Sequence, residues 1–167
     1  MDRLLKTIKQ TPVNKSFLKA RLPHGVKVVS YQHLKGKHRR AVFDKGRPVV
    51  VLIPKKGEKT GHFIVLVPRE RHIEYFSSLG GSPQSELASL NEPLEIMNDL
   101  LGKNFIYNKT QLQSGDYRIN DCASWVLARV YLRHLKLREF VQLFKRKTLS
   151  SSDDVVAIMT LLHFVSK

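Results

Sequence analysis

The sequence predicts one α+β domain, and three observations support this: the length, the composition and the order of the elements. The chain has 167 residues, of which 42% are hydrophobic. That is enough for one sizeable core and too short for two ordinary domains. Strand-like segments fill the first half and helix-like segments the second, an order typical of α+β proteins rather than of a wound parallel sheet. We therefore predict a single domain over residues 1–167.

Four strands are predicted in the first half, after a short basic helix over residues 2–9. They are residues 26–31, 48–53, 62–67 and 73–76. The second and third are continuous apolar runs closed by Pro54 and Pro68, a pattern typical of strands buried on both faces. We expect the third and fourth strands to form a hairpin through residues 69–71.

The second half is predicted to be mainly helical. The predicted helices cover residues 93–101, 122 to about 135, 137–144 and about 150–164, with a loop at 80–83 and a short strand at 104–107. Asn91 and Asp121 are expected to cap the first and second of these helices. The helix that begins at Cys122 is apolar nearly all round, which predicts that it is the buried central helix.

The composition excludes several classes of protein. No apolar run approaches the roughly 20 residues of a membrane span, and the N-terminus lacks the apolar core of a secretory signal. Because Cys122 is the only cysteine, a disulfide framework and a Cys-rich zinc site are both excluded. We expect no metal site, no membrane partner and a reducing compartment.

Positive charge is concentrated in residues 1–60, which hold 16 Lys and Arg against three acidic residues, a net charge of +13. Residues 61–167 contribute only +2 of the total of +15. Such a field attracts polyanions, although a solvated, solubilising face is the simpler explanation. The candidate nucleic-acid contacts are Lys35, Lys37, Arg39, Arg40, Lys55 and Lys56.

Cys122 falls in the first turn of its predicted helix. Unpaired N–H groups and the helix dipole favour a thiolate there, so we expect a lowered pKa for this cysteine. A nucleophilic cysteine needs a base, and His62 is the best placed of the seven histidines because it follows Gly61 at the start of an apolar strand. A small buried cysteine and a structural histidine are the simpler alternatives.

Taken together, these segments resemble the adenain-type cysteine proteases, the viral branch of the clan that also holds the SUMO-specific proteases. Residues 61–65 resemble the family's strand with His and an aromatic, and residues 75–80 its Tyr-Phe-Asp-Ser-Leu/Phe-Gly motif. Residues 112–114 resemble its Gln-Ser segment, and 120–125 its Asn-x-Cys-Gly-x-Trp motif. The tail from residue 151 is similar to the ends of proteases from small dsDNA viruses of the virophage and polinton type.

The resemblance implies a mixed central sheet packed against helices, with Cys122 as nucleophile at the start of the central helix and His62 as general base. It implies that Gln113 lines the oxyanion hole, with Gln111 as a second candidate. The family's acid falls on Ser77, an uncharged residue that we expect to lie within reach of His62. Glu74 should point to the opposite face of its strand, so we assign it no catalytic role.

The function that follows from the resemblance is a virus-encoded cysteine endopeptidase that matures capsid or core precursors, cleaving near glycine. Its expected partners are those precursors and viral DNA, bound without sequence preference. We expect a monomer located in the virion and in the host nucleus or viral factory. No cofactor is required for the chemistry, and the resemblance adds DNA and an activating peptide as candidate activators. Two alternatives stay open: an inactive protease-fold protein that binds nucleic acid in the virion, and a ubiquitin-like-modifier protease.

Overall fold

The computed structural model describes residues 15–55, 61–114, 121–145 and 156. The predicted helices at 2–9 and about 150–164, as well as Lys56, therefore lie outside the described residues, apart from Val156. Val156 is buried in the core and helical.

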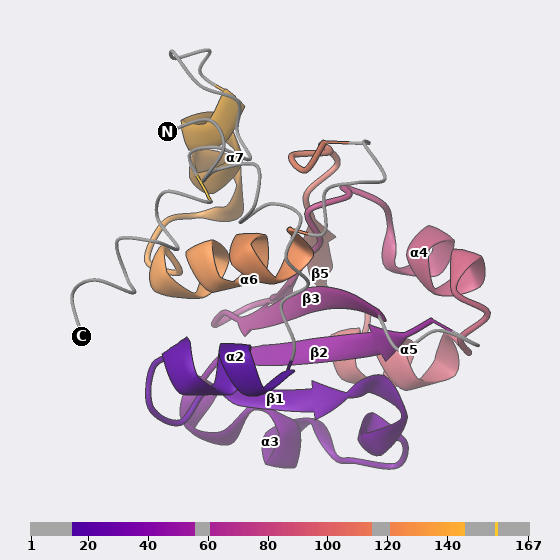
Figure 1. Cartoon of the computed structure of the whole chain (residues 1–167). Helices are drawn as coiled ribbons and strands as arrows, with labels where there is room; N and C mark the ends of the chain where they lie inside the picture. Colours follow the sequence, from indigo (N-terminus) through magenta and orange to yellow (C-terminus); the bar gives the residue numbers. More distant parts are fainter. Residues whose placement is uncertain (1–14, 56–60, 115–120, 146–155, 157–167) are drawn as a thin grey trace.

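A five-stranded mixed sheet organises the described part of the chain, which is α+β as predicted (Figure 1). The strands are β1 (Lys27–Ser30), β2 (Val49–Pro54), β3 (Gly61–Pro68), β4 (Ile73–Phe76) and β5 (Phe105–Tyr107), and they lie in chain order across the sheet. The central pairs β2/β3 and β3/β4 are antiparallel, whereas the outer pairs β1/β2 and β4/β5 are parallel. All four strands predicted in the first half are present, and β3 and β4 form the expected hairpin.

Helices cover both faces of the sheet. They are α2 (Lys15–Arg21), α3 (Arg39–Val42), α4 (Pro83–Ser89), α5 (Glu95–Leu101), α6 (Cys122–Tyr131) and α7 (Leu137–Lys145), with short 3-10 turns at Tyr31–Leu34 and Asp44–Gly46. One core contains residues of α2, α6 and α7 together with Val50, Val65 and Phe76 of the sheet. The other contains residues of α4 and α5 together with Val51 and Leu66. Because alternate residues of β2 and β3 enter opposite cores, these strands are apolar throughout.

The structure corrects two predicted boundaries. Asn91 does not cap α5: its φ is +56°, its N–H donates to the Ala88 carbonyl, and the N-cap position of α5 is Leu94. Helix α6 ends at Tyr131 rather than near residue 135, and the Arg129 side chain donates to the carbonyls of Leu132 and Leu135 just beyond it. Asn91 instead follows α4, a helix that the sequence analysis missed.

Helix α4 begins where the sequence analysis predicted only a loop. Ser82 is its N-cap, with a hydroxyl that accepts a hydrogen bond from the Ser85 N–H at 3.1 Å, and Pro83 occupies the first turn. Serine followed by proline is a helix-start pattern. The pattern was therefore readable, but the seven-residue helix behind it was too short to show a clear apolar period.

Candidate active site

His62 stands at the start of β3, where the sheet holds its backbone close to β2. A Cβ atom on the preceding Gly61 would lie 2.4 Å from the Ile53 carbonyl oxygen, so this approach requires glycine. The His62 side chain is only 11% exposed, and its Nε2 lies 2.8 Å from the Ser77 Oγ. Burial lowers the pKa of His62 to about 4. The ring is therefore neutral at pH 7, as a general base must be.

Ser77 follows the last residue of β4, and its position is fixed by the segment after β5. The side chain of the buried Asn108 accepts from the Ser77 N–H at 3.1 Å and donates to the Ser77 carbonyl at 2.6 Å. Gly80 has a φ of +73°, and a Cβ atom there would lie 2.3 Å from the carbonyl carbon of Thr110. The turn after β4 therefore packs directly on the segment that carries Gln113.

A carboxylate that the sequence analysis did not consider reaches the same site. Glu86 of α4 is buried, and its Oε2 lies 3.7 Å from Nε2 of His62. The Tyr75 hydroxyl donates to this carboxylate at 2.7 Å and the Gly81 N–H at 3.0 Å. Burial raises the pKa of Glu86, while hydrogen bonds from Ser77, Tyr75 and Gly81 act in the opposite direction. A carboxylate from a different element thus lies beside His62, where Ser77 itself carries none.

Cys122 is the first residue of α6, as predicted, and is partly buried. The expected lowering of its pKa is wrong. Burial raises the pKa of the Cys122 thiol, and the nearby Asp121 raises it as well, against lowering by hydrogen bonds from the backbone N–H groups of Phe63, Ala123 and Cys122 itself. Desolvation thus outweighs the helix start. The bond from Phe63, the neighbour of His62, connects the thiol to the start of β3.

Of the two candidate glutamines, Gln113 is buried and Gln111 is exposed. The Ser78 hydroxyl donates to Oε1 of Gln113 at 2.8 Å, and the Gln113 N–H donates to the Ser78 carbonyl at 3.0 Å. Fixing Oε1 on Ser78 turns the NH₂ group of the amide away from Ser78. The Gln111 side chain instead donates to the Gln113 carbonyl at 3.1 Å, so it supports the same segment.

Glu74 lies on the other face of β4, as the strand alternation predicts. Its buried carboxylate accepts hydrogen bonds from Arg129 of α6 and from Arg69, whose Nε lies 2.9 Å from Oε1. Both arginines also donate to backbone carbonyls just beyond α6, including that of Leu135. Because Arg129 is fully buried, this ion pair fixes α6 to the sheet.

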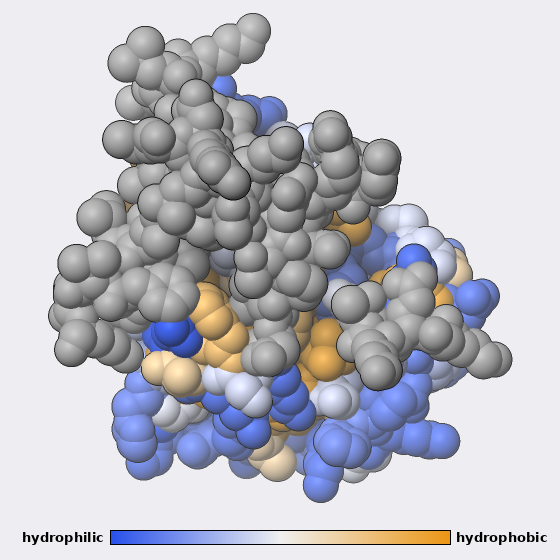
Figure 2. Space-filling view, viewed as in Figure 1, coloured by the Kyte–Doolittle hydropathy of each residue, from blue (hydrophilic) through white to orange (hydrophobic). Residues whose placement is uncertain are grey.

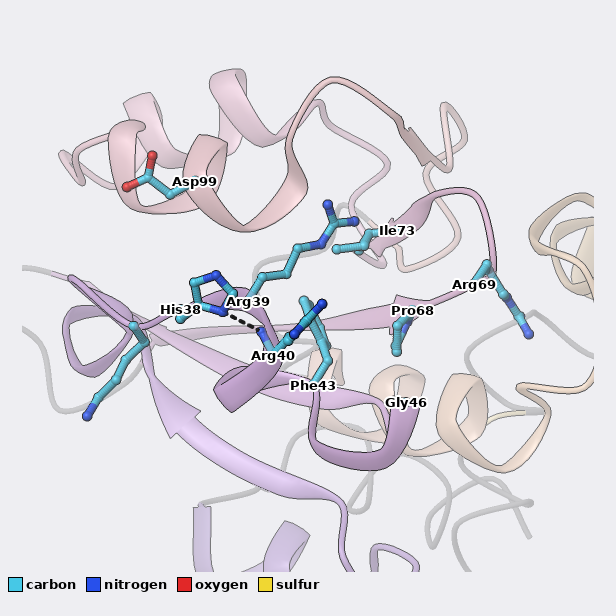
Figure 3. A pocket seen from close by; sticks show the side chains of 10 residues that line it. His38, Arg39, Arg40, Phe43, Gly46, Pro68, Arg69, Ile73 and Asp99 are labelled. Carbon is cyan, nitrogen blue, oxygen red and sulfur yellow. Dashed lines mark hydrogen bonds between the residues drawn. The ribbon is translucent and has the colours of Figure 1, made fainter.

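The predicted nucleic-acid contacts that lie within the described residues are all exposed: Lys35, Lys37, Arg39, Arg40 and Lys55. Figure 2 shows that hydrophilic side chains cover the part of the molecule around α2, β1 and α3. Lys37, Arg39 and Arg40 line a depression of about 590 Å³. Arg69 from the β3–β4 hairpin also lines it, but its side chain points away from Arg39 and Arg40 (Figure 3). Among the described residues that line it, Asp99 is the one acidic residue.

The described fold and site define an α+β protein with a cysteine at the start of its central helix, beside a strand that carries a largely buried histidine near its start. No family model matches the sequence. Over 102 residues the chain is 30% identical to the uncharacterized protein V9 of Sputnik virophage, a match that takes in 54% of this chain and 58% of V9. The chain thus spans little more than half of that relative's length. This similarity relates it to a virophage protein.

Among solved structures, the chain is similar to the central domain of the uncharacterized Lpg1148 protein from Legionella pneumophila. The TM-score is 0.53 at 12% identity, over 93% of this chain and 98% of that domain. Identity this low shows a shared fold alone. Among the described residues, no helix has both the length and the apolar composition needed to cross a bilayer.

Proposed function

We propose that the chain is a cysteine endopeptidase of the adenain type, encoded by a virus and acting on capsid or core precursors near glycine. The observation that carries the proposal is the convergence of four separate segments. The start of β3 brings His62, the end of β4 brings Ser77 within 2.8 Å of it, and the segment after β5 brings Gln113 onto Ser78. The start of α6 brings Cys122 to the backbone of Phe63.

These groups support acyl transfer through a thioester. Because the pKa of His62 is low and that of Cys122 is raised, both groups are neutral at rest. Neutral His62 takes the thiol proton as the sulfur attacks the substrate carbonyl carbon. The Gln113 amide and the Cys122 backbone N–H then donate to the oxyanion. The imidazolium returns its proton to the leaving amine, and water, deprotonated by His62, hydrolyses the thioester.

The proposal is tested by Cys122→Ala in a cleavage assay on a cognate capsid precursor. We expect complete loss of cleavage with an unchanged thermal melt, because the variant removes only the nucleophile. Continued cleavage by the variant would refute the assignment. A glycine-ended modifier vinyl sulfone serves as the second probe: efficient labelling of Cys122 by this reagent, without precursor cleavage, would favour a ubiquitin-like-modifier protease.

The basic depression favours a second candidate function, non-specific binding of nucleic acid, either by the active enzyme or by an inactive virion component. Its cations lie together and exposed, with few aromatic side chains among them, so phosphate contacts should dominate over base stacking. About six phosphate contacts would give a log–log salt slope near −5 on duplex DNA.

Replacing Lys37, Arg39 and Arg40 together with alanine should flatten this slope by about two to three units and leave cleavage of a short peptide unchanged. The matched control replaces three exposed cations outside the depression, Lys103, Lys109 and Arg138, for the same change in net charge. Equal effects of the two triple variants would show that only total charge matters. Absence of any complex at micromolar protein and about 0.15 M salt would favour a solvated face.

A further inference from the structure

Two donors hold the buried carboxylate of Glu86: the Tyr75 hydroxyl at 2.7 Å and the Gly81 N–H at 3.0 Å. Ser77 also lowers the pKa of Glu86, and its hydroxyl lies 2.8 Å from Nε2 of His62. A carboxylate that accepts several hydrogen bonds is stabilised in its ionised form even where burial opposes ionisation.

The surroundings of Nε2 decide the tautomer of His62. Nε2 lies 2.8 Å from the Ser77 hydroxyl oxygen and 3.7 Å from Oε2 of Glu86. An ionised carboxylate can only accept hydrogen bonds, and the Ser77 oxygen is already an acceptor for the Leu79 N–H at 3.2 Å. This environment favours a hydrogen on Nε2, and the ring nitrogen that is left to act as a base is Nδ1.

We propose that Glu86 is the positioning acid of the site: together with Ser77, it holds His62 in the Nε2–H tautomer and stabilises the imidazolium that forms during the reaction. The inference rests on the proposed function. Glu86 takes the part that a strand carboxylate plays in the resembled family, but it comes from helix α4 and lies 3.7 Å from Nε2, which also faces Ser77. The motif at residues 75–80 does not contain Glu86, so the motif alone does not identify this acid.

The groups around His62 determine the direction in which loss of the Glu86 charge changes proton transfer from Cys122. The ionisable groups placed against the ring are the Glu86 carboxylate of α4, 3.7 Å from Nε2, and the Tyr75 hydroxyl of β4, which donates to Glu86. At the start of α6, the Cys122 thiol bonds the N–H of Phe63, the neighbour of His62, and Asp121 raises the pKa of that thiol. Among the described residues, Glu86 is the carboxylate that lies against the His62 ring. Removing this charge disfavours the imidazolium, so proton transfer from Cys122 becomes harder and thiolate appears only at higher pH.

The test measures the rate at which Cys122 reacts with iodoacetamide against pH, followed by peptide kinetics. In Glu86→Gln we expect alkylation at pH 7 to be at least about tenfold slower, with the pH profile moved up by about one unit. We expect kcat to fall about 10²- to 10³-fold with KM within about twofold. This is less than the roughly 10⁴-fold loss seen when a directly bonded triad acid is neutralised. Glu86→Asp, which keeps the charge, should recover part of the loss.

Two further variants separate this inference from simpler explanations. Leu87→Ala removes a fully buried neighbour from the same helix; it should lower stability and leave the alkylation profile in place. Ser77→Ala removes the hydroxyl that lies 2.8 Å from Nε2 while keeping the carboxylate, and it should move the profile in the same direction as Glu86→Gln. If Glu86→Gln does not fold, Ser77→Ala provides the test in its place. The double variant should be little worse than either single one, because the two residues act as one unit.

The outcomes separate the inference from the proposed function on which it rests. If His62→Ala leaves the alkylation profile unchanged, then the Cys–His pair fails and both proposals are overturned. If His62→Ala moves the profile but both Glu86→Gln and Ser77→Ala match the wild type, only the role of Glu86 is overturned. A shift in Leu87→Ala equal to that in Glu86→Gln would also overturn it, because packing of α4 would then explain the effect.

Discussion

Acidification from pH 6.5 to 4 should destabilise the fold through His62. Burial lowers the pKa of this histidine to about 4, whereas an unfolded histidine titrates near about 6.5. Between these values the unfolded chain binds the proton more tightly, so the free energy of unfolding falls as the pH falls. A difference of about 2.5 units, at about 1.4 kcal/mol each, amounts to about 3 kcal/mol. Because the side chain is only 11% exposed, solvent screening removes little of this.

Urea unfolding followed by circular dichroism between about pH 4 and 7 measures this contribution. The comparison uses the wild type, His62→Gln and, as a matched control, His33→Gln at an exposed position. Across the window the wild type and the control should each lose about 3 kcal/mol more than His62→Gln. Glu86 has the opposite sign, since its raised pKa gives stability that is lost as the pH rises, but it is present in all three proteins. Equal losses in the wild type and His62→Gln would refute the reasoning.

Two further predictions concern the scaffold of the site. Glu74→Gln should lower the free energy of unfolding by about 3 kcal/mol, because it leaves the fully buried Arg129 without its carboxylate. The control Glu70→Gln, at an exposed position, should change the free energy of unfolding little. The midpoints of denaturant unfolding measure both effects. Gly80→Ala should cost more than Gly36→Ala: both have φ near +70°, but only at Gly80 does the new Cβ meet backbone. Backbone strain alone costs about 1–2 kcal/mol, and equal melting temperatures for the two would contradict the clash.

Most strands could be predicted from the sequence because their apolar runs record burial directly. In β3, Val65 and Leu66 face different cores, so no polar residue interrupts the apolar run that contains them. Pro68 ends this run at the C-terminal end of the strand. The hairpin followed from the shortness of the connection. Ser77 could be placed near His62 from the motif alone, and the distance of 2.8 Å between their polar atoms agrees with that expectation.

Glu86 could not be predicted, because its role depends on tertiary placement. In the sequence it is one acidic residue in a short polar segment after a Gly-Gly loop, and its own helix had been missed. Its burial and its hydrogen bonds from Tyr75 and Gly81 arise only when α4 packs beside the end of β4. The prediction of a lowered pKa for Cys122 was wrong for a related reason. The helix start can be seen in the sequence, whereas the desolvation that outweighs it is a property of the folded core.

The antiparallel pairing of β3 and β4 has a consequence for how the two charged regions of the molecule affect each other. His62 lies near the start of β3 and Ser77 follows the end of β4, whereas Pro68 and Ile73, at the other ends of the two strands, line the basic depression. The six residue steps of β3 from His62 to Pro68 span about 20 Å. The two strands therefore hold the depression and the candidate active site at opposite ends. A polyanion bound in the depression would leave the space beside His62 open to a peptide.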